Sequence, residues 1–169
     1  MKTRNVHIDI SKSDVFGRVR VKASYLASKS ILTQGAGAYD QIEIADADSI
    51  LTDKQWKEAC SSLTALTENY AELVEVGDDK YTAVLRMPLN FDDRKEALLN
   101  EMMAEYIVND MLSKWCAVAS KSDAEYYLTV TAGMMSDMRS LLATRLRPMR
   151  RERTDDDPER IILREGDEI

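Results

Sequence analysis

The sequence is poor in the residue types that carry metal and nucleophilic chemistry. Among 169 residues it has a single histidine, His7, and two cysteines, Cys60 and Cys116. Zinc sites draw most of their ligands from these two residue types, so this supply argues against one. The cysteines lie far apart, with no Cys-x-x-Cys spacing and no secretory pattern nearby. They are typical of buried thiols in a reducing compartment.

Long apolar runs are also absent. The N-terminal stretch "MKTRNVHIDISKSD" lacks the apolar run of about 7–15 residues that a signal peptide needs. No window approaches the roughly 20 apolar residues of a membrane span. The sequence therefore predicts a protein of the cytoplasm without a membrane segment.

Motifs of catalysis and nucleotide binding are missing too. The stretch "GAGAYD" (residues 35–40) lacks the third glycine and the strand-to-helix context of a dinucleotide-binding fingerprint. Asp46 and Asp48 lie in a turn, and Glu101 and Glu105 lie one turn apart on a polar helix face that is expected to be solvated. "TDDDPE" lacks the glycine and the spaced ligands of a calcium loop. We expect no enzyme activity, no catalytic or metal-binding residues and no cofactor.

The charge balance is acidic. Thirty acidic and 23 basic residues give a formal net charge of −7 and a pI near 4.8. Such a molecule repels nucleic acid at long range. With 44% apolar and 31% charged residues, the composition is that of an ordinary globular chain, and its length favours one domain.

The first part of the chain mixes short strands and helices. Val6, Ile8 and Ile10 alternate with polar residues, which predicts a strand, and helical spacing follows from Asp14 in "DVFGRVRVKASYLASKS". A loop at about 33–48 precedes an amphipathic helix that includes Trp56. Two β-prone runs around Gly77 then predict a β-hairpin at about 72–87.

Two long helices complete the predicted domain. They cover roughly residues 92–119 and 123–146, and the short link "SKS" between them predicts an antiparallel αα-hairpin. Pro148 ends the second helix. The predicted fold is mainly α, a helical bundle with a small β-hairpin: a helical domain at 1–148 and an extended C-terminal arm at 149–169.

The two long helices differ in their apolar faces. The second has one stripe, which includes Leu128, Met138 and Leu142. The first changes face midway, so that either it is central to its own domain or one end meets another subunit. The candidate residues for a contact between subunits are Val108, Met111, Leu112 and Trp115.

The arm "RPMRRERTDDDPERIILREGDEI" is basic, then acidic, and contains one apolar island. Its arginines are helix-terminal cations in a solvated tail, or they dock on an acidic protein surface or on DNA phosphates. The apolar island is a plausible anchor in a groove or on a sheet edge of a partner. The candidate partner-binding residues are Arg147, Arg150, Arg151, Arg153, Ile161, Ile162 and Leu163.

This element order resembles the head-tail connector (head-completion or adaptor) proteins of tailed phages. The stretches "AYDQI", "DKQWKEAC", "IVNDMLSKW" and "KSDAEYYLTVTAGMMSDMRSLLATRLRP" are also similar to small proteins of prophage structural-gene blocks, a likeness that runs from about Val6 to Pro148. The resemblance implies a virion protein, assembled in the host cytoplasm as a ring of about twelve copies beneath the portal. Its arm would reach the portal protein, and DNA would slide through an acidic lumen.

Two alternatives stay open at this point. The extra N-terminal segment and the loop at 33–48 depart from the short connectors, which leaves a tail-completion protein or another neck or tail protein as one alternative. The other is a non-viral helical binding or regulatory module that acts through its arginine cluster.

Overall fold

The computed structural model describes residues 3–34, 44, 49–92 and 94–145. It confirms the predicted mainly helical fold, with a long antiparallel αα-hairpin and a small antiparallel sheet. The predicted boundary at 148 and the arm at 149–169 lie outside the described residues, as does most of the loop at 33–48. Along the chain the elements are β1 (Thr3–Ser11), α1 (Lys12–Gln34), α3 (Ser49–Thr67), β2 (Ala71–Val76), β3 (Lys80–Pro88), α4 (Arg94–Ala119) and α5 (Lys121–Ala143).

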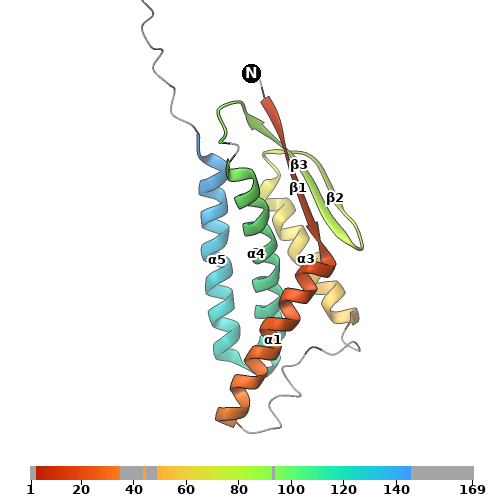
Figure 1. Ribbon diagram of the computed structural model, residues 1–169, viewed down its shortest axis with the longest axis vertical. Helices are drawn as coiled ribbons and strands as arrows, with labels where there is room; N and C mark the ends of the chain where they lie inside the picture. Colours follow the sequence, from red (N-terminus) through yellow and green to blue (C-terminus); the bar gives the residue numbers. More distant parts are fainter. Residues whose placement is uncertain (1–2, 35–43, 45–48, 93, 146–169) are drawn as a thin grey trace, which may run out of the picture.

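The sheet has three strands in the order β1-β3-β2, all antiparallel (Figure 1). The predicted hairpin is present, and the predicted first strand extends it: Thr3 lies opposite Pro88 and Ser11 opposite Lys80. Alternate residues point to the helices, as a half-buried sheet requires. The buried residues of this face are Val6, Ile8, Ile10, Tyr81, Ala83, Leu85 and Met87.

Helix α4 covers the outer edge of β1. The backbone N–H of His7 donates to Oε1 of Glu96 at 3.1 Å, and the N–H of Asp9 donates to Oδ1 of Asn100 at 3.1 Å. Two N–H groups that an edge strand would leave to water or to a foreign strand are therefore occupied by side chains of the chain itself.

Helix α4 is the centre of the fold, in contact with α1, α3, α5 and β1 (Figure 1). Val108, Met111 and Leu112 are completely buried in the core of the chain itself. The prediction that these residues meet another subunit is therefore wrong, and the helix changes face because different elements of its own domain pack along it. Trp115 is half-buried.

Helix α5 follows α4 after a single residue, Ser120, whose backbone is extended (φ −150°, ψ 100°). The Ser120 hydroxyl donates to Oδ2 of Asp123 at 2.6 Å. The helix begins two residues earlier and ends sooner than predicted. Its apolar stripe is also narrower than predicted, because α5 packs chiefly on α4: Met138 and Leu142 are buried, whereas Leu128 is mostly exposed. Within the described residues, no helix combines the length and apolar character that crossing a membrane requires.

Candidate interaction surface

Neither set of predicted site residues provides a surface in the described part of the chain, for different reasons. All seven predicted partner-binding residues, from Arg147 to Leu163, lie outside the described residues. Of the predicted subunit contacts, only Trp115 retains some exposure. A candidate surface has to be built from other side chains of the described part.

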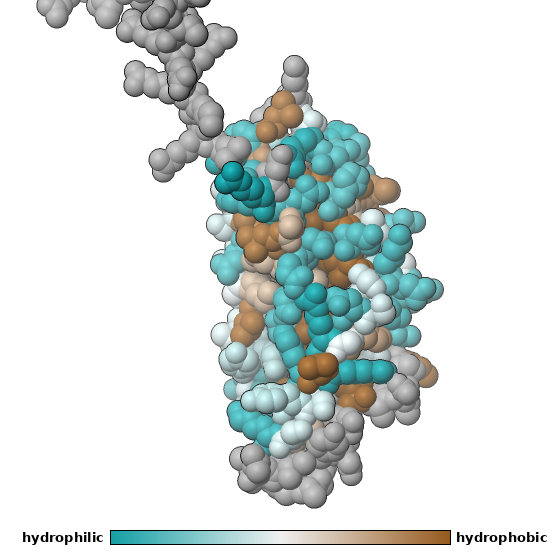
Figure 2. Space-filling model, viewed as in Figure 1, coloured by the Kyte–Doolittle hydropathy of each residue, from teal (hydrophilic) through white to brown (hydrophobic). Residues whose placement is uncertain are grey.

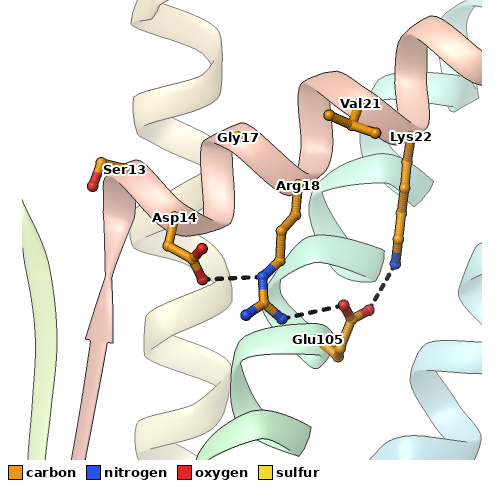
Figure 3. A pocket seen from close by; sticks show the side chains of 7 residues that line it. All are labelled: Ser13, Asp14, Gly17, Arg18, Val21, Lys22 and Glu105. Carbon is orange, nitrogen blue, oxygen red and sulfur yellow. Dashed lines mark hydrogen bonds and ion pairs between the residues drawn. The ribbon is translucent and has the colours of Figure 1, made fainter.

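One such surface is the groove between α1 and α4, where charged side chains form a connected cluster (Figure 3). Arg18 is at its centre: Nε lies 3.0 Å from Oδ2 of Asp14, and Nη1 lies 3.4 Å from Oε1 of Glu105 and also bonds Glu101. Lys22 Nζ lies 2.7 Å from Oε2 of Glu105. The pair Glu101/Glu105, which the sequence placed on a solvated face, remains at least partly exposed and also holds α1 to α4.

The cations and carboxylates of the cluster pair with each other. The hydrogen bond to Glu101 raises the pKa of Arg18, and the same bond lowers the pKa of Glu101. Three carboxylates face two cations, so neither cation is left to attract a phosphate or a nucleic acid. The cluster acts as a clamp between two helices.

Apolar side chains extend this groove along α1. The groove has a volume of about 440 Å³ and reaches Val21, which is 70% exposed. Tyr25, one turn further, is 72% exposed, and Leu98 on α4 is 51% exposed. Figure 2 shows apolar surface over α1, α4 and α5 as separate patches among hydrophilic side chains. The groove is therefore suited to a modest, mixed contact.

Sequence reasoning missed Val21 and Tyr25. Both are one turn apart, and both lie off the stripe formed by Val15, Val19 and Ala23, which is buried. That offset was visible in "DVFGRVRVKASYL" and could have marked them as a second, exposed face.

The second candidate surface is the edge of the sheet formed by β2. Leu73 is 57% exposed and Val76 is 44% exposed, and Glu72 and Glu75 beside them are exposed as well. In the order β1-β3-β2, β2 has a strand on one side only. This edge combines exposed apolar atoms, carboxylates and an open backbone.

The chemistry-bearing residues of the described part lie apart from both surfaces. Cys60 and Cys116 are buried, as predicted, and burial raises the pKa of Cys60 to about 12 and of Cys116 to about 11. Both are therefore thiols at neutral pH. His7 is exposed on the outer face of β1. Among residues 3–34, 44, 49–92 and 94–145, no three histidine, cysteine or acidic side chains gather closely enough to hold a metal ion.

Comparison with known proteins finds no family model, no curated protein and no solved structure that matches the chain. Any functional conclusion therefore depends on the surfaces described above and on the order of the elements.

Proposed function

We propose that the chain is a structural, non-catalytic subunit of the neck of a tailed-phage virion. In this role it is a head-tail connector that assembles in the host cytoplasm as a ring under the portal protein and docks through residues 149–169. The observation that carries the proposal is the element order: helix α3, the β2–β3 hairpin, the long α4–α5 hairpin and then the arm. Connector proteins of this kind are recognised by that order more than by fixed residues.

The build of the body supports this role. Helix α4 is packed on several sides and clamped to α1 by ion pairs, and α5 runs antiparallel beside it. The last described residues of α5 lie at one end of this long body (Figure 1). A segment that follows Arg145 therefore starts from an end of the body, from which an arm can reach a partner above or beside the subunit.

The charge supports the second part of the role, contact with passing DNA. A net charge of −7 gives a chain that repels phosphates, and the cations of the α1–α4 groove are already paired with carboxylates. A ring of such subunits would let DNA slide without adhering. The arginines at the root of the arm are the local exception, and the proposal assigns them to an acidic surface of the partner.

The test is a solution mass combined with negative-stain images, with and without the cognate portal protein. The expected result is a ring, or a complex in which this chain adds density beneath the portal. A protein that remains monomeric in both samples and adds no density to the portal contradicts the proposal. If a third sample with purified tails gains density from this chain and the portal does not, a tail-completion protein is favoured instead.

The arginine cluster favours a second candidate, a binding module for nucleic acid. Arg147, Arg150, Arg151 and Arg153 are four cations within seven residues. Binding through them should weaken steeply with salt, because each neutralised phosphate releases counterions. Negligible DNA binding at low salt removes this candidate and leaves the neck protein.

A further inference from the structure

The two edges of the sheet are treated differently. At β1, side chains of Glu96 and Asn100 accept hydrogen bonds from two edge N–H groups. At β2, no side chain of the described residues bonds a backbone N–H of the strand. The molecule therefore closes one edge with its own α4 and leaves the other available to a further strand.

The open edge has a defined pattern on its two faces. Val74 lies opposite Ala83 and Val76 opposite Tyr81, so these two valines belong to the face that packs on the helices. Leu73 and Glu75 belong to the outer face. Because Leu73 and Val76 are about half exposed, a strand added here would cover apolar atoms on both faces of the sheet.

The apolar island of the arm has the complementary pattern. In Arg160–Arg164, "RIILR", Ile161 and Leu163 would share one face of a strand. Arg160, Ile162 and Arg164 would share the other, and isoleucine is a strong strand former. The order of charged and apolar residues is the same in both directions, so the match holds for either strand direction.

The acidic residues of β2 favour the arginine-flanked strand of the arm over a second β2 strand at this edge. Glu72, Glu75 and the bulge between Ala71 and Leu73 disfavour pairing of β2 with a second β2, since like charges would lie across from each other. The same carboxylates attract a strand with an arginine at each end. Glu72 already pairs with Arg86 at 2.6 Å, which leaves Glu75 as the carboxylate that can respond.

The end of α5, from which the donated strand would come, and the β2 edge, which would accept it, lie where an exchange between copies is favoured. Figure 1 shows α5 and β2 on opposite flanks of the body, with α4 and α3 between them. Residues 146–159 span up to about 3.3 Å each when extended, which reaches an adjacent copy placed beside the β2 flank. A donor on one flank and an acceptor on the other is a head-to-tail contact, and repetition of such a contact produces a ring when the rotation closes.

We propose that residues 160–164 of one copy add as a fourth strand to the β2 edge of an adjacent copy. Ile161 and Leu163 lie beside Val74 and Val76 over the helices, and Arg160 and Arg164 lie on the outer face with Glu75. This inference rests on the self-assembly in the proposed function, but not on the portal protein. It leaves the arginines at the root of the arm to contact the portal.

Cross-linking of two separately purified full-length variants tests the exchange. One carries Leu73→Cys on β2 and the other carries Ile162→Cys in the arm, and the mixture is treated with a short bismaleimide. Cys60 and Cys116 are buried thiols in both proteins and serve as the unreactive background, which the unsubstituted chain verifies. The matched control replaces Leu73→Cys by His7→Cys, an exposed position on the outer face at the opposite edge.

The expected result is a cross-linked dimer that contains one chain of each variant, and none with His7→Cys. A link within one chain of the Leu73→Cys/Ile162→Cys double variant, with none in the mixture, overturns the exchange. No link in either sample, or equal links with His7→Cys, overturns it too. If the chains cross-link but do not bind the portal, the strand exchange stands and the neck role is removed. If they bind the portal without a cross-link, the neck role stands and the strand exchange is removed.

Charge reversal gives a second readout that does not need cysteine. Arg160→Glu/Arg164→Glu should weaken self-association at least about fivefold, because opposed charges across neighbouring strands become like charges. Glu75→Arg in the same chain should restore most of the loss. Equal self-association of all three proteins contradicts the assigned contact.

Discussion

The backbone N–H of His7 is bonded to the carboxylate of Glu96 at 3.1 Å, across 89 positions of sequence. This bond joins the edge strand of the sheet to the first turn of the central helix. Arg4 also reaches Glu96, with Nη2 at 3.4 Å from Oε2. The N-terminal strand is thus fixed to the core by its outer edge as well as by its pairing with β3.

Glu96→Ala should lower the free energy of unfolding by about 1 kcal/mol, the usual net value of a hydrogen bond. Glu96→Gln keeps an oxygen acceptor for the N–H of His7 and should recover most of this loss. Urea denaturation of both variants measures the difference. Equal losses would mean that the charge facing Arg4, and not the bond to the strand, is what stabilises the edge.

Glu101 should make stability depend on pH. Its hydrogen bond to Arg18 lowers its pKa, so the unfolded chain binds a proton more readily than the folded chain. The stabilisation is therefore present above the ordinary value of 4.5 and is lost as the pH falls through the lower folded value. Glu101→Gln should be less stable than the parent at pH 7, and the difference should shrink as the pH falls towards 3, measured as urea midpoints. A difference that persists unchanged at pH 3 contradicts this cause.

Gly17→Ala and Gly133→Ala should each stabilise the fold. Both glycines lie within helices, and a Cβ added at either position meets no atom within 4 Å. Alanine should therefore gain about 0.5–1 kcal/mol per site from helix propensity. Gly77→Ala is the contrasting variant, since its Cβ would lie 3.2 Å from the carbonyl oxygen of Lys80 and no gain is expected. Thermal melts compare the three.

Leu112→Ala and Leu98→Ala test the corrected role of α4. Leu112 is completely buried, and its truncation should cost about 2–5 kcal/mol, the range for a core leucine. Leu98 is 51% exposed and should cost far less. A small loss at Leu112 together with weakened self-association would instead restore the interpretation of this face as a contact between subunits.

Deletion of residues 150–169 should leave the melting temperature unchanged within error but abolish assembly. The core formed by the described residues runs from Val6 to Leu142, and we expect it to be complete without the arm. Circular dichroism and solution mass give the two measurements. Unfolding of the shortened chain would mean that the domain boundary at 148 is wrong.

Local patterns predicted the elements better than their contacts. The strand at Val6–Ile10, the hairpin around Gly77 and both long helices follow from periodicities that neighbouring residues share. The pairing of β1 with β3 joins segments more than sixty residues apart, and no local pattern encodes it. The predicted two-stranded hairpin is therefore part of a sheet with three strands in the structure.

Burial on α4 and α5 was harder to predict for a related reason. An apolar side chain on a helix is buried only if another element covers its face, and the number of covering elements is a property of the whole fold. Leu98 and Leu128 have helical spacing to buried neighbours but remain exposed, whereas Val108 and Leu112 are covered by the domain itself. The exposed pair Glu101/Glu105 likewise gained cationic partners from α1, which is 83 positions away in both cases.

The one-residue connection at Ser120 has a mechanical consequence. With no slack between α4 and α5, a pull applied at Arg145 does not first straighten a loop. It loads the whole contact between the two helices in shear, and α4 passes that load to β1 through the bonds of Glu96 and Asn100. Tension on the arm is therefore carried by many parallel contacts at once and ends in the sheet.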